Sequence, residues 1–163
     1  MDLITDASSI INLVNAGALE AVASISGRTI CVCPLVASEC EPTCAAELLR
    51  LQQHGLIRFI DLEEISAEIF LNLLDFFDLG EGETECLSLL QNNDFVFCCD
   101  DSKARSAGVV LVGTDRVVGS LRLLKWAVAD GIFDAATAFE YYERMKAFGG
   151  FLPEVTQEWF GNE

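Results

Sequence analysis

The sequence predicts an α/β protein, a three-layer α/β/α sandwich around a central, mostly parallel sheet. Short apolar segments alternate with segments of helical periodicity along the whole chain. Residues 95–99 are apolar at every position, as expected of a central strand covered on both faces. Strands separated by helices need crossover connections, which place helices on both sides of a parallel sheet.

The first third of the chain begins with a predicted strand at Leu3. Ser8 or Ser9 is expected to cap the first helix, and Gly17 to end it. Proline suits the first turn of a helix, so helices are expected from two of the three prolines. The expected elements are a strand over 3–5, a helix from 8 or 9 to 17, a short helix from 19 to about 27, a strand over 29–33, helices from 34 and over 42–55, and a strand or extended connection over 56–60.

The rest of the chain continues this alternation. Ile65, Ile69, Leu73 and Phe76 are spaced by four, four and three residues, which indicates a helix. Gly131 is expected to stop the helix before it. The expected elements are helices over 65–76 and about 82–92, a strand over 95–99, a short helix over 102–107, a buried strand over 109–112, and helices over 121–129 and about 135–147.

Length and composition favour one domain over 1–163, with 134–163 as a C-terminal helical extension. No run of about 20 apolar residues lacks a charge, so no membrane span is expected. The first residues lack the basic segment of a secretory signal. Seven cysteines in a chain with a sizeable core indicate reduced thiols and a cytoplasmic location rather than a disulfide framework.

The charge is strongly acidic overall but uneven. Asp and Glu number 26 against 10 Lys and Arg, a net charge of −16, which opposes non-specific binding of nucleic acid. Five basic residues nevertheless fall within a stretch that has Asp115 as its one acid: Lys103, Arg105, Arg116, Arg122 and Lys125. This stretch is either a patch that guides a polyanion or a solvated face that balances its acidic neighbours.

Acidic residues follow two predicted strands. Asp6 ends the first strand, and Asp100 with Asp101 ends the most apolar one. Ligands of open parallel sheets bind beyond the carboxyl ends of the strands, so these side chains are expected at one rim. The alternative for each of them is helix capping, because aspartate at a strand-to-helix turn satisfies free backbone N–H groups.

Two glutamates are predicted on apolar helix faces. Glu83 lies three, four and seven residues before Cys86, Leu87 and Leu90, and Glu39 follows Leu35 and Val36 by four and three. A carboxylate on such a face must be protonated, paired or bound to a metal. Glu81 and Glu85 are expected to point elsewhere and to interact with the helix dipole.

If the acids converge, their mutual repulsion calls for a cation. Two unit charges about 4 Å apart repel by about 4 kcal/mol at an effective dielectric constant near 20. Mg²⁺ or Mn²⁺, which prefer oxygen ligands, would suit such a set. The cysteines at 31, 33, 40 and 44 lack the usual zinc-knuckle spacing, and Cys31 and Cys33, like Cys98 and Cys99, are predicted to pack in the core. His54, near a helix end, is expected to interact with the helix dipole.

Several motifs together resemble the PIN domain, and within it the VapC-like branch. The motifs are Asp6-Ala7-Ser8-Ser9, Cys33-Pro34 followed by Glu39, Leu79-Gly80-Glu81-Gly82-Glu83, the segment Phe97 to Arg105 with its Asp-Asp pair, and Gly113-Thr114 with the helix that follows. The resemblance covers about 2–133. It implies a metal-dependent ribonuclease, often the toxin of a toxin–antitoxin pair and commonly a homodimer.

The resemblance also implies roles for individual residues. The catalytic acids would be Asp6, Glu39, Glu83 and Asp100, with Asp101 as an alternative or supplement to the last. Asp6, Glu83, Asp100 and Asp101 would hold Mg²⁺ or Mn²⁺, and Ser8 would support them. Lys103, Arg105 and Arg122 would bind flanking phosphates of RNA, although a structural ion pair explains Arg105 equally well.

A second function class remains open at this point. A PIN-fold protein without significant nuclease activity would act through protein contacts, its acidic surface attracting a basic partner such as an antitoxin. The C-terminal region is aromatic, which suits either a core or a surface for an oligomer or partner. These aromatic residues are Phe139, Tyr141, Tyr142, Phe148, Phe151, Trp159 and Phe160.

Overall fold

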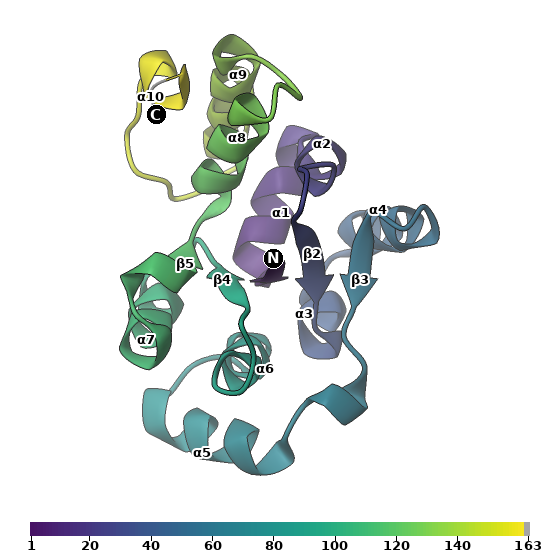
Figure 1. The fold of residues 1–163 in the computed structure, drawn as a ribbon, viewed down its shortest axis with the longest axis vertical. Coiled ribbons are helices and arrows are strands. Elements are labelled where there is room, and N and C mark those ends of the chain that lie inside the picture. Colours follow the sequence, from purple (N-terminus) through teal and green to yellow (C-terminus); the bar gives the residue numbers. More distant parts are fainter. Residues whose placement is uncertain (162–163) are drawn as a thin grey trace.

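The computed structural model describes residues 1–161 and is built around one sheet of five strands. The strand order is β3-β2-β1-β4-β5, so β1 lies at the centre, and every neighbouring pair is parallel (Figure 1). The strands are β1 (Asp2–Thr5), β2 (Thr29–Val32), β3 (Ile57–Phe59), β4 (Val96–Cys98) and β5 (Val117–Val118). The predicted parallel sheet is therefore confirmed.

Helices cover both faces of the sheet and confirm the three-layer α/β/α architecture. Those of the N-terminal half are α1 (Ala7–Ala16), α2 (Leu19–Ala23), α3 (Pro34–Glu39), α4 (Pro42–Gln53), the 3-10 turn η1 (Leu62–Glu64) and α5 (Ala67–Phe77). The C-terminal half contributes α6 (Glu81–Leu90), α7 (Ser102–Val112), the 3-10 turn η2 (Thr114–Arg116), α8 (Ser120–Ala129), α9 (Ala135–Ala147) and α10 (Gln157–Gly161).

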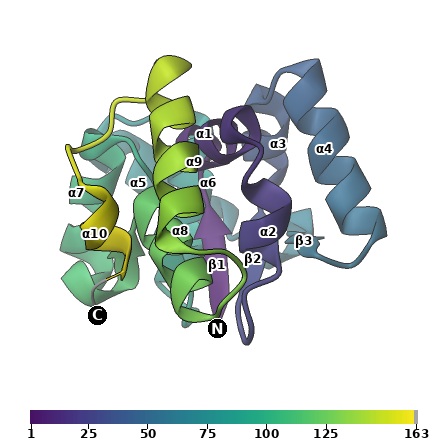
Figure 2. The same ribbon diagram turned by 90° about the horizontal axis from the view of Figure 1, so that it is seen from above.

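The two helical layers are built from separate parts of the chain. Helices α1, α2, α8 and α9 pack together on one side of the sheet, and α5, α6 and α7 form the other layer, with α3 against α6 (Figure 1). Helix α10 packs on α8 and α9, and Figure 2 shows it on the opposite side of the molecule from α4. Strand β1 is consequently covered on both faces, and Leu3 and Ile4 are buried in the core.

One predicted strand is wrong. Residues 109–112 were expected to form a buried strand, but α7 continues through Val112, and the Val110 side chain is 71% exposed. The edge strand β5 comes only after it. An apolar run of four residues suits a helix or a strand, and here the helix is fixed by close packing. A Cβ on Gly108 would lie 2.8 Å from the Phe97 ring, so this face of α7 sits tightly on the sheet.

The first helix boundary also differs from its prediction. Ser8 and Ser9 lie inside α1, and Asp6 is the N-cap, its side chain accepting the Ser8 N–H. Gly17 ends this helix as predicted, with φ of 75°. The next helix ends at Ala23 rather than near position 27. The boundaries of the predicted 135–147 helix are confirmed by α9.

The C-terminal aromatic residues divide between core and surface. Tyr142 and Phe160 are buried, whereas Phe148 is 67% and Phe151 is 96% exposed. Helix α10, which carries Phe160, lies within the expected C-terminal helical extension, although its bounds were not predicted. Residues 162–163, the end of the predicted C-terminal extension, lie outside the described residues.

All seven cysteines are free, and six of them are buried. The predicted core positions of Cys31, Cys33, Cys98 and Cys99 are confirmed, and burial raises the pKa of Cys31 to about 11. His54 is at the C-terminal end of α4, where its Nδ1 lies 2.7 Å from the Arg50 carbonyl oxygen. None of the helices within residues 1–161 has the length and apolar character that crossing a membrane requires.

Candidate active site

The ends of β1 and β4 bring the predicted aspartates to one rim of the sheet. The two strands are paired, and the chain continues the pairing past β1, because the Asp6 N–H donates to the Cys98 carbonyl at 2.9 Å. Asp6 follows β1, while Asp100 and Asp101 lie just after β4. The expectation that these strand ends meet is therefore fulfilled.

Asp6 is the most buried carboxylate of this rim, with 2% of the residue exposed. Its Oδ2 atom accepts from Ser8 N at 3.1 Å, Ser8 Oγ at 2.7 Å and Cys99 Sγ at 3.4 Å. Its Oδ1 atom is buried and has no hydrogen-bond partner within residues 1–161. A buried polar group without a partner costs about 1–3 kcal/mol, and more when it is charged, so this oxygen is set up to meet a ligand.

Ser8 links the two acidic strand ends. Its hydroxyl donates to Asp6 Oδ2 and accepts the backbone N–H of Asp100 at 3.1 Å. The same oxygen lies 3.5 Å from the Cys99 thiol. Ser8 therefore orients Asp6, consistent with a supporting role.

Glu39 and Glu83 meet at the N-terminus of α6. Glu39, at the end of α3, accepts the Gly82 N–H at 3.1 Å, and Glu83 accepts the Gly80 N–H at 3.0 Å. A side chain at position 82 would displace the Glu39 carboxylate, because its Cβ would lie 2.5 Å from Glu39 Oε1. The Leu-Gly-Glu-Gly-Glu motif thus provides both the glycine that lets Glu39 approach the start of α6 and the acid Glu83. Both carboxylates also interact favourably with the helix dipole.

The environment holds both glutamates closer to their protonated form. Burial is the main cause that raises the pKa of Glu83. The carboxylates of Asp6, Asp101 and Glu39 raise the pKa of Glu83 further. Burial likewise raises the pKa of Glu39, with additional contributions from Asp6 and Glu81. Four acids that are distant in the sequence therefore interact as one electrostatic cluster: Asp6, Glu39, Glu83 and Asp101.

The expected burial of Glu39 is only partly correct. The residue as a whole is exposed, and its carboxylate reaches the site by extending to Gly82. Only three residues of this short helix follow the buried Val36, too few to fix a face from spacing alone. Glu83 is of intermediate exposure, as its position beside buried Cys86 and Leu87 suggested.

The two neighbouring aspartates after β4 have different surroundings. Both oxygens of Asp100 accept hydrogen bonds at 2.8 Å, one from Asn12 Nδ2 and one from the Ser120 N–H. Asp101 caps α7, its Oδ1 accepting two backbone N–H groups, and it acts electrostatically on Glu83. Asp100 thereby ties α1 to α8, whereas Asp101 faces the acidic cluster.

Glu85 was expected to point away from the core, and this is wrong. Only 2% of the residue is exposed, and its Oε2 accepts the Leu35 N–H at the start of α3 at 2.7 Å. Burial raises the pKa of Glu85, against the lowering effect of this hydrogen bond. Helices α3 and α6 are thus capped reciprocally, since Glu39 of α3 also caps the start of α6. No signal within one helix could have shown a carboxylate that caps another.

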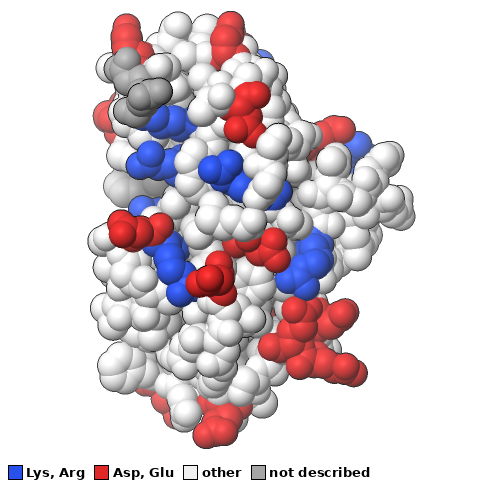
Figure 3. Space-filling model, in the orientation of Figure 1, with Lys and Arg blue, Asp and Glu red and all other residues white. Residues whose placement is uncertain are grey.

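The predicted phosphate-binding residues differ in how they are held. Lys103 forms an ion pair with Asp78, its Nζ lying 3.2 Å from the carboxylate. The same ammonium group also contacts the Asp78 carbonyl. Arg105 donates to the Cys99 carbonyl at 2.9 Å rather than forming the alternative ion pair with an aspartate. The Arg122 guanidinium makes no hydrogen bond or ion pair within the described part of the chain. Figure 3 shows basic side chains over the α7 and α8 side of this face, with acidic ones between them.

The donor set suits a hard divalent cation, although its side chains are not gathered around one point. Among residues 1–161, no group of three or more His, Cys, Asp or Glu side chains is arranged so that it could hold a metal ion. Glu39 and Glu83 instead accept backbone N–H groups of α6. The buried Oδ1 of Asp6 and the neighbouring carboxylates nevertheless provide the oxygen donors that Mg²⁺ and Mn²⁺ prefer.

Comparison with known protein families agrees with this fold. A family model described as a PIN domain matches residues 2–158, nearly the whole described chain. The chain belongs to the PIN domain family. The comparison with curated proteins and that with solved structures gave no match. Membership confirms the PIN resemblance and extends it beyond residue 133, through α9 and into α10. The PIN fold is of the nuclease type, which makes hydrolysis of a nucleic acid the first activity to test.

Proposed function

We propose that this PIN domain is a metal-dependent ribonuclease that hydrolyses RNA phosphodiester bonds. The observation that supports it is the buried Asp6 Oδ1, which has no hydrogen-bond partner within residues 1–161 and lies in a cluster with Glu39, Glu83 and Asp101. A purely structural cap would use both oxygens or expose one to water. This carboxylate instead keeps one buried oxygen for a ligand.

Mg²⁺ or Mn²⁺ would be held by Asp6, Glu83 and the aspartates after β4, with Glu39 completing the set. When bound, such a cation activates water and stabilises negative charge on the phosphate. Ser8 keeps Oδ2 of Asp6 occupied, so that Oδ1 remains for the cation. Glu39 and Glu83, whose pKa values are raised, release any proton they hold when a cation replaces it.

The finer assignments are part of the same proposal. The motifs resemble the VapC-like branch, which favours a cytoplasmic toxin with an antitoxin partner and a homodimeric state. The alternative is a PIN-fold protein that acts through protein contacts without significant nuclease activity. The buried Asp6 Oδ1, which has no hydrogen-bond partner within residues 1–161, favours the enzyme, because a surface that only binds another protein has no need of such an oxygen.

Cleavage of single-stranded RNA with Mn²⁺ and with EDTA tests the proposal. Wild type is compared with Asp6→Asn, Asp101→Asn and Asp100→Asn, and with Glu68→Gln as a control that removes an exposed charge on α5. Asp6→Asn and Asp101→Asn should reduce Mn²⁺-dependent cleavage by about 100-fold or more, while Glu68→Gln leaves it unchanged. Circular dichroism checks that each variant is folded.

Asp100→Asn separates a structural from a metal-binding role. Its amide would set an N–H₂ group against either the Asn12 or the Ser120 donor, so the unfolding free energy should fall by about 1–3 kcal/mol. Cleavage that is independent of metal and equal in wild type and Asp6→Asn would refute the nuclease assignment and favour the binding alternative.

A further inference from the structure

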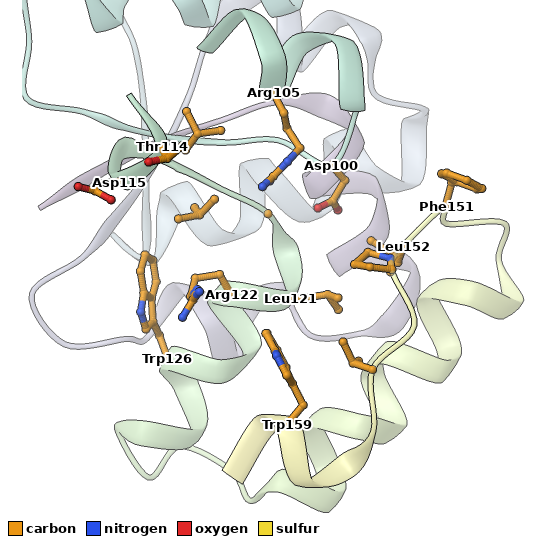
Figure 4. A pocket seen from close by; sticks show the side chains of 15 residues that line it. Asp100, Arg105, Thr114, Asp115, Leu121, Arg122, Trp126, Phe151, Leu152 and Trp159 are labelled. Atoms are coloured by element: carbon orange, nitrogen blue, oxygen red, sulfur yellow. The ribbon is translucent and has the colours of Figure 1, made fainter. Parts of the chain in front are cut away.

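A pocket of about 620 Å³ adjoins the acidic rim on the α8 side. It is formed by α7, β5, α8 and the C-terminal segment that leads into α10 (Figure 4). Asp100 lines it, so the pocket begins where the acidic cluster ends. Its size is within the range of pockets that enclose small organic ligands.

Both tryptophans of the chain line this pocket. Arg122 and Trp126 are one helical turn apart on α8, and Trp159 comes from α10. Figure 4 shows the Arg122 side chain between the two indoles in this view. Each indole also contacts a cation, with the Arg28 guanidinium 4.3 Å from the Trp126 ring centre and Lys125 Nζ 4.7 Å from that of Trp159. These contacts fix the orientation of both indoles at one end of the pocket.

Two guanidinium groups in the pocket keep donors available. The Arg122 guanidinium has no hydrogen bond or ion pair within residues 1–161, and the only acceptor of the Arg105 guanidinium there is the Cys99 carbonyl. Arg105 lines the pocket beside Asp100, as Figure 4 shows. Arginine binds phosphate through planar, two-pronged hydrogen bonds, so this pair provides anchors for a phosphate.

We propose that this pocket binds one nucleotide of the substrate strand, the base against the indoles and its phosphate against Arg105 and Arg122. This inference rests on the proposed ribonuclease function and adds a substrate subsite to it. Stacking of bases on aromatic side chains and arginine contacts to the backbone are the usual means of holding single strands. Thr114 and Asp115, which also line this pocket, offer polar groups to the edge of a base.

A polymer has a path out of this pocket. A second hollow of about 600 Å³ shares Asp100, Arg105 and Phe151 with the first and continues along α7 to Ser106 and Val109. Phe151, 96% exposed, stands where the two hollows meet and offers another ring to a neighbouring base. An acidic peptide would satisfy the arginines but would leave the indole faces without a flat partner, so the pocket favours a nucleotide.

Intrinsic fluorescence gives a direct assay, because the two tryptophans that line the pocket are the only ones in the chain. The full chain in EDTA is titrated with uridine and adenosine monophosphates, the two nucleosides, inorganic phosphate and a hexaglutamate peptide. At least one nucleoside monophosphate should quench the fluorescence saturably, and about tenfold more tightly than its nucleoside.

Variants assign the effect to the pocket. Arg122→Gln should weaken nucleotide binding about tenfold or more. Arg50→Gln, which removes a charge from the surface of α4, should leave it unchanged. Equal affinity for inorganic phosphate and for the nucleotides would reduce the pocket to an anion site and overturn the inference. Quenching by hexaglutamate alone would overturn it in favour of an acidic protein partner.

The same titration separates this inference from the proposed activity. Saturable quenching by nucleotides, together with no Mn²⁺-dependent RNA cleavage, supports the pocket and refutes the ribonuclease. Mn²⁺-dependent cleavage without quenching by any nucleotide supports the ribonuclease and refutes the pocket.

Discussion

Replacing Gly82 by alanine should separate the activity of this protein from its stability. The added Cβ would lie 2.5 Å from Glu39 Oε1, 2.8 Å from Glu39 Cδ and 2.9 Å from Glu39 Oε2. These distances are too short for any rotation of the methyl group to relieve, so the Glu39 carboxylate must leave its place on the Gly82 N–H. A misplacement of about 1 Å in a catalytic group can reduce activity about 100-fold, and we expect a loss of 10–100-fold.

The effect on stability should be small. The atoms that clash are the end of a long, exposed side chain, which moves at little cost. Loss of the hydrogen bond between Glu39 and Gly82 should lower the free energy of unfolding by about 0.5–1.5 kcal/mol. Alanine in place of glycine in a helix should raise the free energy of unfolding by about 0.4–1 kcal/mol, because the unfolded chain then has less conformational entropy to lose on folding. The two terms oppose each other, so the free energy of unfolding should change by less than about 1 kcal/mol.

The assays are urea unfolding and Mn²⁺-dependent RNA cleavage, with Gly80→Ala as the matched control. A Cβ on Gly80 would lie 3.6 Å from Glu83 Oε2, an ordinary contact, so this variant should keep most of its activity. Full activity of Gly82→Ala would refute the role of Glu39 in the site. A loss of more than about 3 kcal/mol of stability would show that the close approach serves folding instead.

Three other changes probe the structure around the rim. Ser8→Ala should cost about 1–3 kcal/mol in urea unfolding, because it removes a donor from the buried Asp6 carboxylate and the acceptor of the part-buried Asp100 N–H. Ser9→Ala should cost less, since that buried hydroxyl has no hydrogen-bond partner within residues 1–161, and equal costs would contradict this. Glu85→Ala should lower the free energy of unfolding by a similar 1–3 kcal/mol, whereas Glu85→Gln, which keeps an acceptor for the Leu35 N–H, should lower it by clearly less. Equal losses in calorimetry would show that Glu85 does not cap α3. Folding raises the pKa of Glu39 and Glu83, so the folded state binds more protons and their contribution to stability declines as pH rises above about 4.3. The Tm of Glu39→Gln/Glu83→Gln relative to wild type should therefore increase from pH 4 to 7 in EDTA, and a constant difference would show that the two groups are not perturbed.

The position of the aspartates was predictable because strand ends of a parallel sheet share an edge. The apolar run before Asp100 and the short strand before Asp6 identified two such ends without knowledge of the strand order. The difference between Asp100 and Asp101 was not predictable. It depends on Asn12 and Ser120, whose placement beside β4 follows from how α1 and α8 pack.

The errors at Val109 and Glu85 have a common origin. Local spacing reports which residues of one helix share a face, but not what that face meets. The valines after Gly108 continue a helix because Gly108 lets that helix approach Phe97. Glu85 is buried because the start of α3 lies beside it and presents a backbone N–H. In both cases a contact between elements distant in the chain decides the outcome.

Helices α3 and α6 are joined by two independent side-chain caps, and one of them does not involve the acidic rim. Glu39 holds the start of α6, and Glu85 independently holds the start of α3. If the proposed cation drew Glu39 away from Gly82, the hydrogen bond from Leu35 to Glu85 would still hold α3 against α6. Under that proposal, Glu39 would exchange a backbone N–H for a metal ion by turning its side chain alone, without movement of either helix.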